Sequence, residues 1–202
     1  LSTEIIQSQL EAVLDDMAVD VVKTGMLPSP EIIETVASVF DRYQLKKIVI
    51  DPVMVATSGA RLSSANTITP FRKILYKRLT VLTPNIPEAE ALSGITIASE
   101  KDMYKAGEIL LNQGCQAVLI KGGHLSGEKA TDILFRQDAN PEHFSSTFVD
   151  TPNLHGTGCS LGSAIAAHLA LGNDLSTAVG KSKQYISEAI AAGASITTGS
   201  GS

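Results

Sequence analysis

The segment HGTGC, from His155 to Cys159, places two glycines and a cysteine directly before an apolar helical pattern. Glycine lets a backbone approach a ligand closely, and the first turn of a helix has N–H groups without an acceptor in the helix. These donors and the positive end of the helix dipole can bind an anion such as a phosphate. Gly156, Thr157 and Gly158 are therefore candidate anion-binding residues. A short G-x-G is a weak signal by itself, so a tight turn that uses glycine for packing remains an alternative.

Cys159 adds a group that could move a proton at the same place. A helix N-terminus favours the thiolate form of a cysteine, and a thiolate can act as a general base near neutral pH. The alternative is that cysteine is only a small residue tolerated at a tight turn. The other cysteine, Cys115, lies far away in the sequence, and the two lack the spacing of metal ligands. We expect two free thiols, as in the reducing cytoplasm.

Two charged residues follow apolar segments that are typical of buried strands. Lys121 ends the segment QAVLIK and is followed by Gly122 and Gly123, so it could reach the oxygens of a phosphate. Alternatively, it is a solvated charge at the end of a strand. Asp51 ends the segment KKIVID and precedes a proline. It could help to hold a metal ion, or Asp-Pro could simply begin a turn.

Asn85 and Glu88 lie three positions apart, where a predicted strand meets a predicted helix. This spacing is typical of a capping box, in which the two residues satisfy backbone N–H groups reciprocally. The same pair could instead order water around Mg²⁺, which usually keeps several waters and binds through one or two carboxylates and substrate phosphates. The sequence leaves both roles open.

The elements that must position these residues alternate along the chain. Apolar periodicity and capping residues such as Ser29 and Ser99 predict helices over residues 4–17, 29–44, 64–78, 87–94 and 99–114, with two more after Cys159. Apolar, β-branched runs predict strands over residues 19–26, 46–54, 79–85 and 116–123. An antiparallel pair is expected over residues 132–136 and 143–150.

This alternation predicts an α/β fold with three layers, in which helices cover both faces of a mostly parallel sheet. Ligands of such sheets bind at the carboxyl ends of the strands. We therefore expect four segments to converge on one edge of the sheet: Asp51, residues 83–88, residues 121–123 and residues 155–159.

Composition favours a soluble protein with a small-molecule partner. The chain has 202 residues, of which 44% are hydrophobic and 18% charged, as expected for one globular domain. Its formal charge of -5 comes without a basic run, which argues against nucleic acid or an anionic membrane as a partner. No apolar run approaches the roughly 20 residues of a membrane span. We expect a cytoplasmic protein.

Five segments carry a resemblance to a known family. KTGML, DPVM, TPNIPEAEAL, VLIKGGHL and HGTGCSLGSAIAA resemble, in order and approximate spacing, the hydroxymethylpyrimidine/phosphomethylpyrimidine kinases of thiamine biosynthesis, which are members of the ribokinase-like superfamily. The resemblance covers nearly the whole chain. It implies transfer of the γ-phosphoryl group of ATP to 4-amino-5-hydroxymethyl-2-methylpyrimidine, and then a second transfer to the monophosphate.

The resemblance also implies a role for each candidate residue. Most members of the superfamily have an aspartate as general base where this sequence has Cys159, whereas the pyrimidine kinases have cysteine. The implied anion hole consists of Gly156, Thr157, Gly158 and Cys159. The implied ATP contacts are Lys121, Gly122, Asn85 and Thr157. The residues that would organise Mg²⁺ through water are Asp51, Asn85 and Glu88. The residues that would line the pyrimidine pocket are Met26, Val53 and Cys159.

The sequence departs from the family pattern at its ends. The family opens with a strand and a GSDSSGGAGIQ-like segment that this sequence lacks, and it closes with a motif beyond the last residue here. We therefore expect a single ribokinase-like domain over residues 1–202 that is incomplete at both termini. The family resemblance also implies a homodimer. Two alternatives remain: a pyridoxal or pyridoxine kinase of the same superfamily, and a truncated nucleotide-binding regulator without activity.

Overall fold

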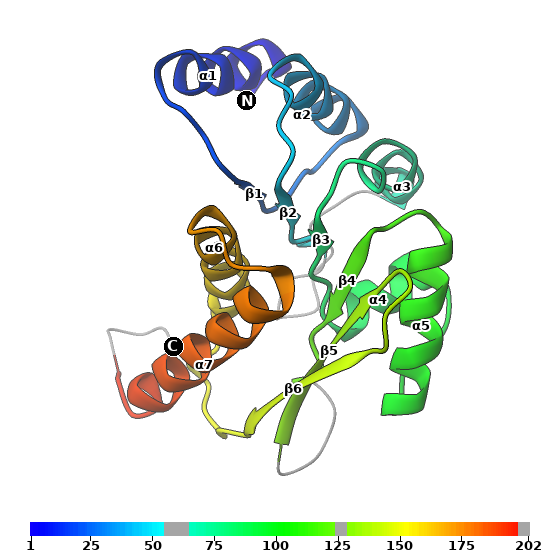
Figure 1. Cartoon of the computed structure of the whole chain (residues 1–202), viewed down its shortest axis with the longest axis vertical. Helices are drawn as coiled ribbons and strands as arrows, with labels where there is room; N and C mark the ends of the chain where they lie inside the picture. Colours follow the sequence, from blue (N-terminus) through cyan, green and yellow to red (C-terminus); the bar gives the residue numbers. More distant parts are fainter. Residues whose placement is uncertain (55–64, 124–128, 198–202) are drawn as a thin grey trace.

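A mixed sheet with the strand order β1-β2-β3-β4-β5-β6 forms the centre of the computed structural model, which describes residues 1–54, 65–123 and 129–197 (Figure 1). The strands are β1 (Val22–Thr24), β2 (Ile48–Ile50), β3 (Val81–Leu82), β4 (Ala117–Ile120), β5 (Lys129–Arg136) and β6 (Glu142–Thr147). Strands β1 to β4 are parallel, whereas β5 and β6 are each antiparallel to the strand before. The predicted sheet and its antiparallel pair are therefore confirmed.

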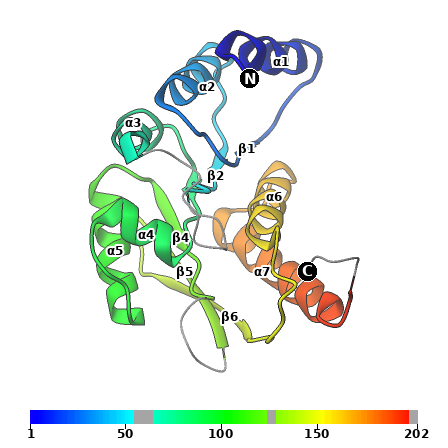
Figure 2. The ribbon, with the colours of Figure 1, turned by 180° about the vertical axis from the view of Figure 1, so that it is seen from behind.

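Helices cover both faces of this sheet, as Figures 1 and 2 show. The helices of one face are α1 (Thr3–Asp16), α2 (Pro30–Arg42), α3 (Ile68–Leu75), α4 (Ile86–Ser93) and α5 (Glu100–Asn112). The helices of the other face are α6 (Thr157–Ala170) and α7 (Leu175–Gly193), which pack against each other. None of the helices in the described ranges is long and apolar enough to cross a lipid bilayer.

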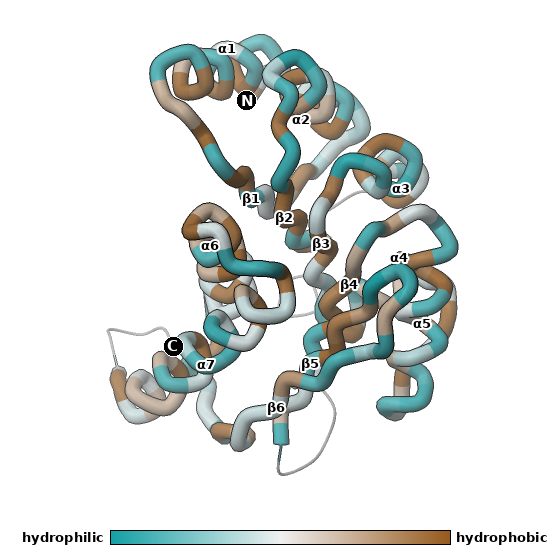
Figure 3. The backbone as a smooth tube through the Cα atoms, in the orientation of Figure 1, coloured by the Kyte–Doolittle hydropathy of each residue, from teal (hydrophilic) through white to brown (hydrophobic). Residues whose placement is uncertain are grey.

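The strands are continuously apolar because they are buried from both sides. Ile48 and Ile50 of β2 belong to the core beneath α2 to α5, whereas Val49 between them belongs to the core beneath α6 and α7. Residues of β3 and β4 divide between the two cores in the same way, as expected for a strand whose side chains alternate between faces. Figure 3 shows these strands as hydrophobic segments at the centre of the molecule.

Local capping sets the ends of several helices. The side chain of Ser29 accepts a hydrogen bond from Ile32 N at 3.4 Å, and that of Ser99 accepts one from Asp102 N at 3.4 Å. Gly94 ends α4 with a φ of 82°, a left-handed conformation that glycine adopts without a steric penalty. The predicted caps at Ser29 and Ser99 are confirmed.

Element boundaries differ from the predictions by a few residues. The first residue of the helix predicted over residues 64–78 lies outside the described residues. The rest of this segment contains a 3-10 turn, η1 (Ala65–Thr67), followed by α3. Strands are shorter than the apolar runs that contain them, and β3 has two residues. A strand ends where its neighbours stop pairing, and a single run of sequence does not contain that information.

Candidate active site

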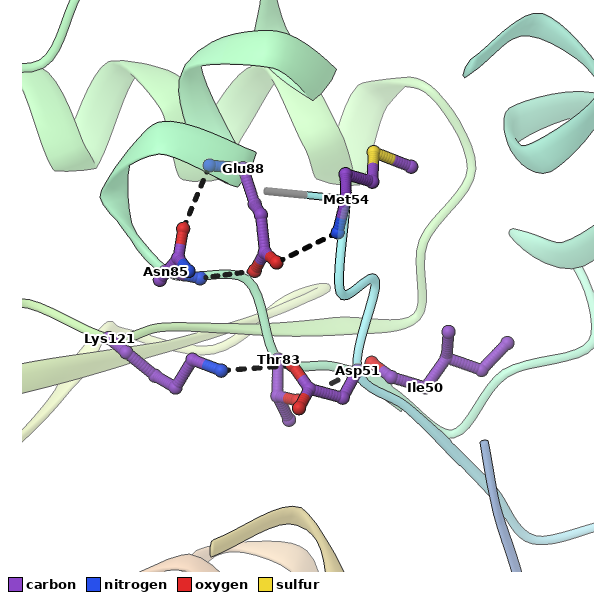
Figure 4. Close-up of polar contacts among 7 residues, drawn as sticks. All are labelled: Ile50, Asp51, Met54, Thr83, Asn85, Glu88 and Lys121. Atoms are coloured by element: carbon purple, nitrogen blue, oxygen red, sulfur yellow. Dashed lines mark hydrogen bonds and ion pairs between the residues drawn. The ribbon is translucent and has the colours of Figure 1, made fainter. Parts of the chain in front are cut away.

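The segments that follow β1, β2, β3 and β4 lie side by side at the carboxyl edge of the sheet. Asp51 N donates to Thr24 O at 3.1 Å, and Thr83 N donates to Ile50 O at 2.9 Å. Lys121 N donates to Pro84 O at 2.9 Å, which ties the end of β4 to the segment after β3. Figure 4 shows the side chains that these segments bring together. The predicted convergence is present.

Lys121 and Asp51 form a buried ion pair at this edge. Lys121 Nζ lies 2.9 Å from Asp51 Oδ1, and the two side chains are 14% and 3% exposed (Figure 4). Lys121 is therefore not a solvated charge, and Asp51 does more than begin a turn. Removal of either partner would leave the other charge uncompensated in a largely buried place.

The N-terminus of α6 lies directly against this pair. Gly156, with a φ of 81°, reverses the chain before the helix begins at Thr157. A methyl group on Gly158 would lie 3.3 Å from Lys121 Nζ and 3.8 Å from Asp51 Oδ2. A side chain at Gly158 would therefore crowd the lysine.

The first turn of α6 offers free donors beside Lys121. The backbone N–H groups of Gly158 and Cys159 have no acceptor among the described residues. Thr157 has no free donor for an anion: its Oγ1 donates to Leu154 O at 2.8 Å, and its N–H donates to the same oxygen at 3.3 Å. An anion at this place would meet two backbone donors, the positive end of the helix and a lysine.

The two cysteines have opposite surroundings. Cys159 is exposed at the start of α6, whereas Cys115 is 1% exposed at the end of the segment that leads into β4. Burial raises the pKa of the Cys115 thiol well above its ordinary value. Cys159 is the thiol that solvent or a substrate can reach.

Asn85 and Glu88 form a complete capping box at the start of α4. Glu88 N donates to Asn85 Oδ1 at 2.9 Å, and Asn85 N donates to Glu88 Oε2 at 2.9 Å (Figure 4). Met54 N donates to the other carboxylate oxygen, Glu88 Oε1, at 3.1 Å. Burial raises the pKa of Glu88, and the nearby Lys121 charge and these backbone donors partly oppose that rise.

The donor set of this region fits Mg²⁺ through water better than by direct coordination. Both oxygens of Glu88 already accept backbone hydrogen bonds, and Asn85 Oδ1 accepts another. Asp51 Oδ1 is paired with Lys121, which leaves Oδ2 facing α6. Within the described ranges, no group of three or more His, Cys, Asp or Glu residues is placed to hold a metal ion. Mg²⁺ commonly retains waters and binds substrate phosphates as well.

Gly122 occupies a position where only glycine fits. A methyl group there would lie 2.0 Å from Thr131 O, and the Gly122 N–H donates to Asp132 Oδ1 at 3.0 Å. Asp132 Oδ2 in turn accepts from Lys183 Nζ of α7 at 2.9 Å, with both side chains buried. Sequence reasoning missed this second ion pair; a charged residue inside the apolar segment TDILF was the available signal.

The predicted pocket residues lie on neighbouring segments. Met26 is 48% exposed just after β1, and Val53 follows β2 with a φ of 44°, which is unusual for a β-branched residue. A methyl group on Gly25 would lie 3.9 Å from Val53 Cγ2. The structure therefore places the segments of Met26 and Val53 next to each other at the carboxyl edge.

Replacement of Glu88 with glutamine tests the two roles of this residue. A glutamine has one side-chain oxygen, so either Asn85 N or Met54 N loses its acceptor, and we expect a decrease of about 1–3 kcal/mol in the free energy of unfolding. Denaturant titration measures the change in stability. The Mg²⁺ concentration for half-maximal rate measures whether Glu88 also helps to hold the metal ion. If stability falls and the Mg²⁺ requirement stays constant, Glu88 acts only as a cap.

Comparisons with known proteins identify the family of this chain. A model of the family described as phosphomethylpyrimidine kinase matches residues 1–202. The chain is 43% identical over 185 residues to the thiamine biosynthesis bifunctional protein ThiED of Geobacter sulfurreducens, covering 92% of this chain and 38% of that protein. It is 37% identical over 202 residues to the hydroxymethylpyrimidine/phosphomethylpyrimidine kinase of Escherichia coli, covering 100% of this chain and 76% of that enzyme.

Solved structures show the same fold. A phosphomethylpyrimidine kinase from Clostridium difficile is 41% identical with a TM-score of 0.80, over 94% of this chain and 77% of that one. The pyridoxal kinase of Bacillus subtilis, solved as an ADP complex, is 38% identical with a TM-score of 0.87, over 94% and 72% of the two chains. The fold is therefore that of the ribokinase-like kinases, as predicted. Because the family model spans all 202 residues and the Escherichia coli kinase is 37% identical over the whole chain, this chain belongs to the phosphomethylpyrimidine kinase family.

Proposed function

We propose that this chain is the kinase domain of an enzyme that uses ATP to phosphorylate 4-amino-5-hydroxymethyl-2-methylpyrimidine and then its monophosphate. The observation that carries the proposal is the free N-terminus of α6 against the Lys121–Asp51 pair. Phosphoryl transfer requires mainly positioning and charge stabilisation, and this arrangement supplies donors and a cation for a transferring phosphoryl group.

In the proposed reaction, each group has a defined task. The N–H groups of Gly158 and Cys159 bind the transferring phosphoryl, and Lys121 neutralises nucleotide phosphate charge beside Gly122. The hydroxyl oxygen of the pyrimidine forms the new bond to the γ-phosphorus, the bond from that phosphorus to the bridging oxygen breaks, and ADP leaves. The Cys159 thiolate accepts the hydroxyl proton. Asn85 and Thr157 would contact the nucleotide, as the family resemblance implies.

Mg²⁺ would supply charge neutralisation of the nucleotide phosphates in this reaction. Asp51, Asn85 and Glu88 would hold it through water, since their oxygens are largely engaged within the protein. Met26 and Val53 would line the pyrimidine pocket. We also propose a cytoplasmic enzyme that acts as a homodimer, following the family resemblance and the two free thiols.

The direct test compares ATP-dependent phosphorylation of the pyrimidine alcohol, its monophosphate and pyridoxal by the whole protein that contains this chain. Pyridoxal is included because solved relatives of this fold are named pyridoxal kinases. We expect the largest kcat/KM for the pyrimidines. A larger kcat/KM for pyridoxal would overturn the substrate assignment, and ATP binding without any transfer would favour a regulator.

Replacement of Lys121 with alanine should weaken the use of ATP more than the binding of the pyrimidine. Loss of a charge-assisted phosphate contact costs about 1.5–3 kcal/mol, or roughly 10- to 100-fold in KM for ATP. The control is Lys105→Ala, which breaks a more exposed ion pair with Asp102. Steady-state kinetics at varied ATP measures the effect. An unchanged KM and kcat would remove Lys121 from the ATP site.

A further inference from the structure

Lys23 is a second lysine of the carboxyl edge that the proposed reaction leaves without a task. It lies in β1, and its side chain packs against Gly162 of α6. A methyl group on Gly162 would lie 3.0 Å from Lys23 Cε and 4.0 Å from Asp51 Cβ. Gly158 and Gly162, one turn apart on α6, thus leave space for Lys121 and Lys23 respectively.

Lys23, unlike Lys121, has no direct partner for its charge among the described residues. Asp51 is paired with Lys121 at 2.9 Å, whereas Lys23 has no ion pair or side-chain hydrogen bond in the part of the chain that the structure describes. Lys23 is half-buried, and its ammonium, 3.6 Å from the position that a methyl group on Gly25 would take, is therefore an unpaired positive charge at the carboxyl edge. A partly buried lysine without an ion-pair partner favours an anionic ligand.

The two lysines serve different sides of the site. Lys121 lies next to Gly122, on the side assigned to ATP. Lys23 Nζ lies 3.6 Å from the position that a methyl group on Gly25 would take, and that same position is 3.9 Å from Val53 Cγ2. Lys23 therefore lies beside the segments of Met26 and Val53, on the side assigned to the pyrimidine.

We propose that Lys23 binds the phosphate group of the monophosphorylated pyrimidine and so determines specificity for the second transfer. This inference rests on the proposed function, because it assigns a residue to one of the two proposed acceptor substrates. The alcohol has no phosphate for Lys23 to bind, whereas in the monophosphate the phosphate is itself the acceptor: one of its oxygens forms the new bond to the γ-phosphorus, the bond from that phosphorus to the bridging oxygen breaks, and ADP leaves. Lys23 is a specificity residue for one acceptor and contributes nothing to the binding of ATP.

The test uses Lys23→Met, which retains an unbranched stem against Gly162 and removes the charge. Loss of a charge-assisted contact should raise KM for the monophosphate by about 10- to 100-fold. The KM values for the alcohol and for ATP should not change. The matched control is Lys46→Met, since Lys46 is exposed just before β2 and remote from this edge. Calorimetric binding of each acceptor to both variants and the unmodified protein provides a readout that does not need turnover.

Each outcome decides the proposal. A selective loss for the monophosphate supports it. An equal rise in KM for ATP and the monophosphate would assign Lys23 to the nucleotide, and unchanged kinetics and binding would leave Lys23 without a ligand; either result overturns the proposal. If the unmodified protein phosphorylates the alcohol, the proposed function stands even when Lys23 fails this test. If the unmodified protein binds neither acceptor, both the proposed function and the assignment of Lys23 fail.

Discussion

Replacement of Cys159 with serine should lower kcat by about 10²- to 10⁴-fold and leave the affinity for ATP nearly unchanged. The backbone N–H groups of Gly158 and of residue 159 do not depend on the side chain, so the anion hole stays. A serine hydroxyl is too weak an acid to provide an anion near neutral pH and cannot take the proton of the acceptor hydroxyl. Cys159→Asp should restore part of the rate, because a carboxylate can serve as the base.

Chemical modification provides an independent measurement at the same residue. Iodoacetamide should react with Cys159 before Cys115, because Cys159 is exposed whereas Cys115 is buried and has a raised pKa. ATP together with the pyrimidine should protect Cys159, and peptide mass spectrometry identifies the modified thiol. A serine variant with unchanged kcat between about pH 6 and 9 would show that Cys159 is not the base, and the anion hole would then be the whole contribution of HGTGC.

Replacement of Asp132 with alanine should cost about 3–5 kcal/mol in the free energy of unfolding, because it leaves the buried ammonium of Lys183 uncompensated. The substitution also removes the acceptor of the Gly122 N–H. Because Gly122 is held against Thr131 O on one side and by Asp132 on the other, the turn after β4 should loosen and KM for ATP should rise. Denaturant unfolding and steady-state kinetics measure the two effects.

Matched variants separate the charge from the hydrogen bond. Asp132→Asn keeps an acceptor for Gly122 and removes the ion pair, so it should lower stability with a smaller change in KM for ATP. The control Asp41→Ala breaks the more exposed pair with Arg78, which should contribute at most about 1 kcal/mol. Adding Lys183→Met to Asp132→Ala should recover stability, since no buried charge is then left unpaired. If Asp132→Ala lowers the free energy of unfolding no more than Asp41→Ala does, the buried ion pair contributes no more to stability than the exposed one.

The sequence by itself determined the local features of this protein. Caps such as Ser29 and Ser99 act on N–H groups three residues away, so local spacing was enough to predict them. The capping box of Asn85 and Glu88 has the same short range, and its spacing made it one of two open roles. Strands buried from both sides require continuous apolar runs, so the class of fold followed from pattern alone. The resemblance supplied the family, which the comparisons confirmed.

Only the tertiary structure decided which charged side chains form ion pairs. Lys121 and Asp51 are 70 positions apart, and Asp132 and Lys183 are 51 apart. Lys23 reaches α6 only because β1 pairs with β2 in one register, with Lys23 opposite Val49. A shift of one residue would turn each of these side chains to the other face of the sheet, and no local spacing specifies that register. Pairing of buried charges is set by the packing of whole elements, which is why the sequence named Lys121 and Asp51 separately and missed Lys23, Asp132 and Lys183.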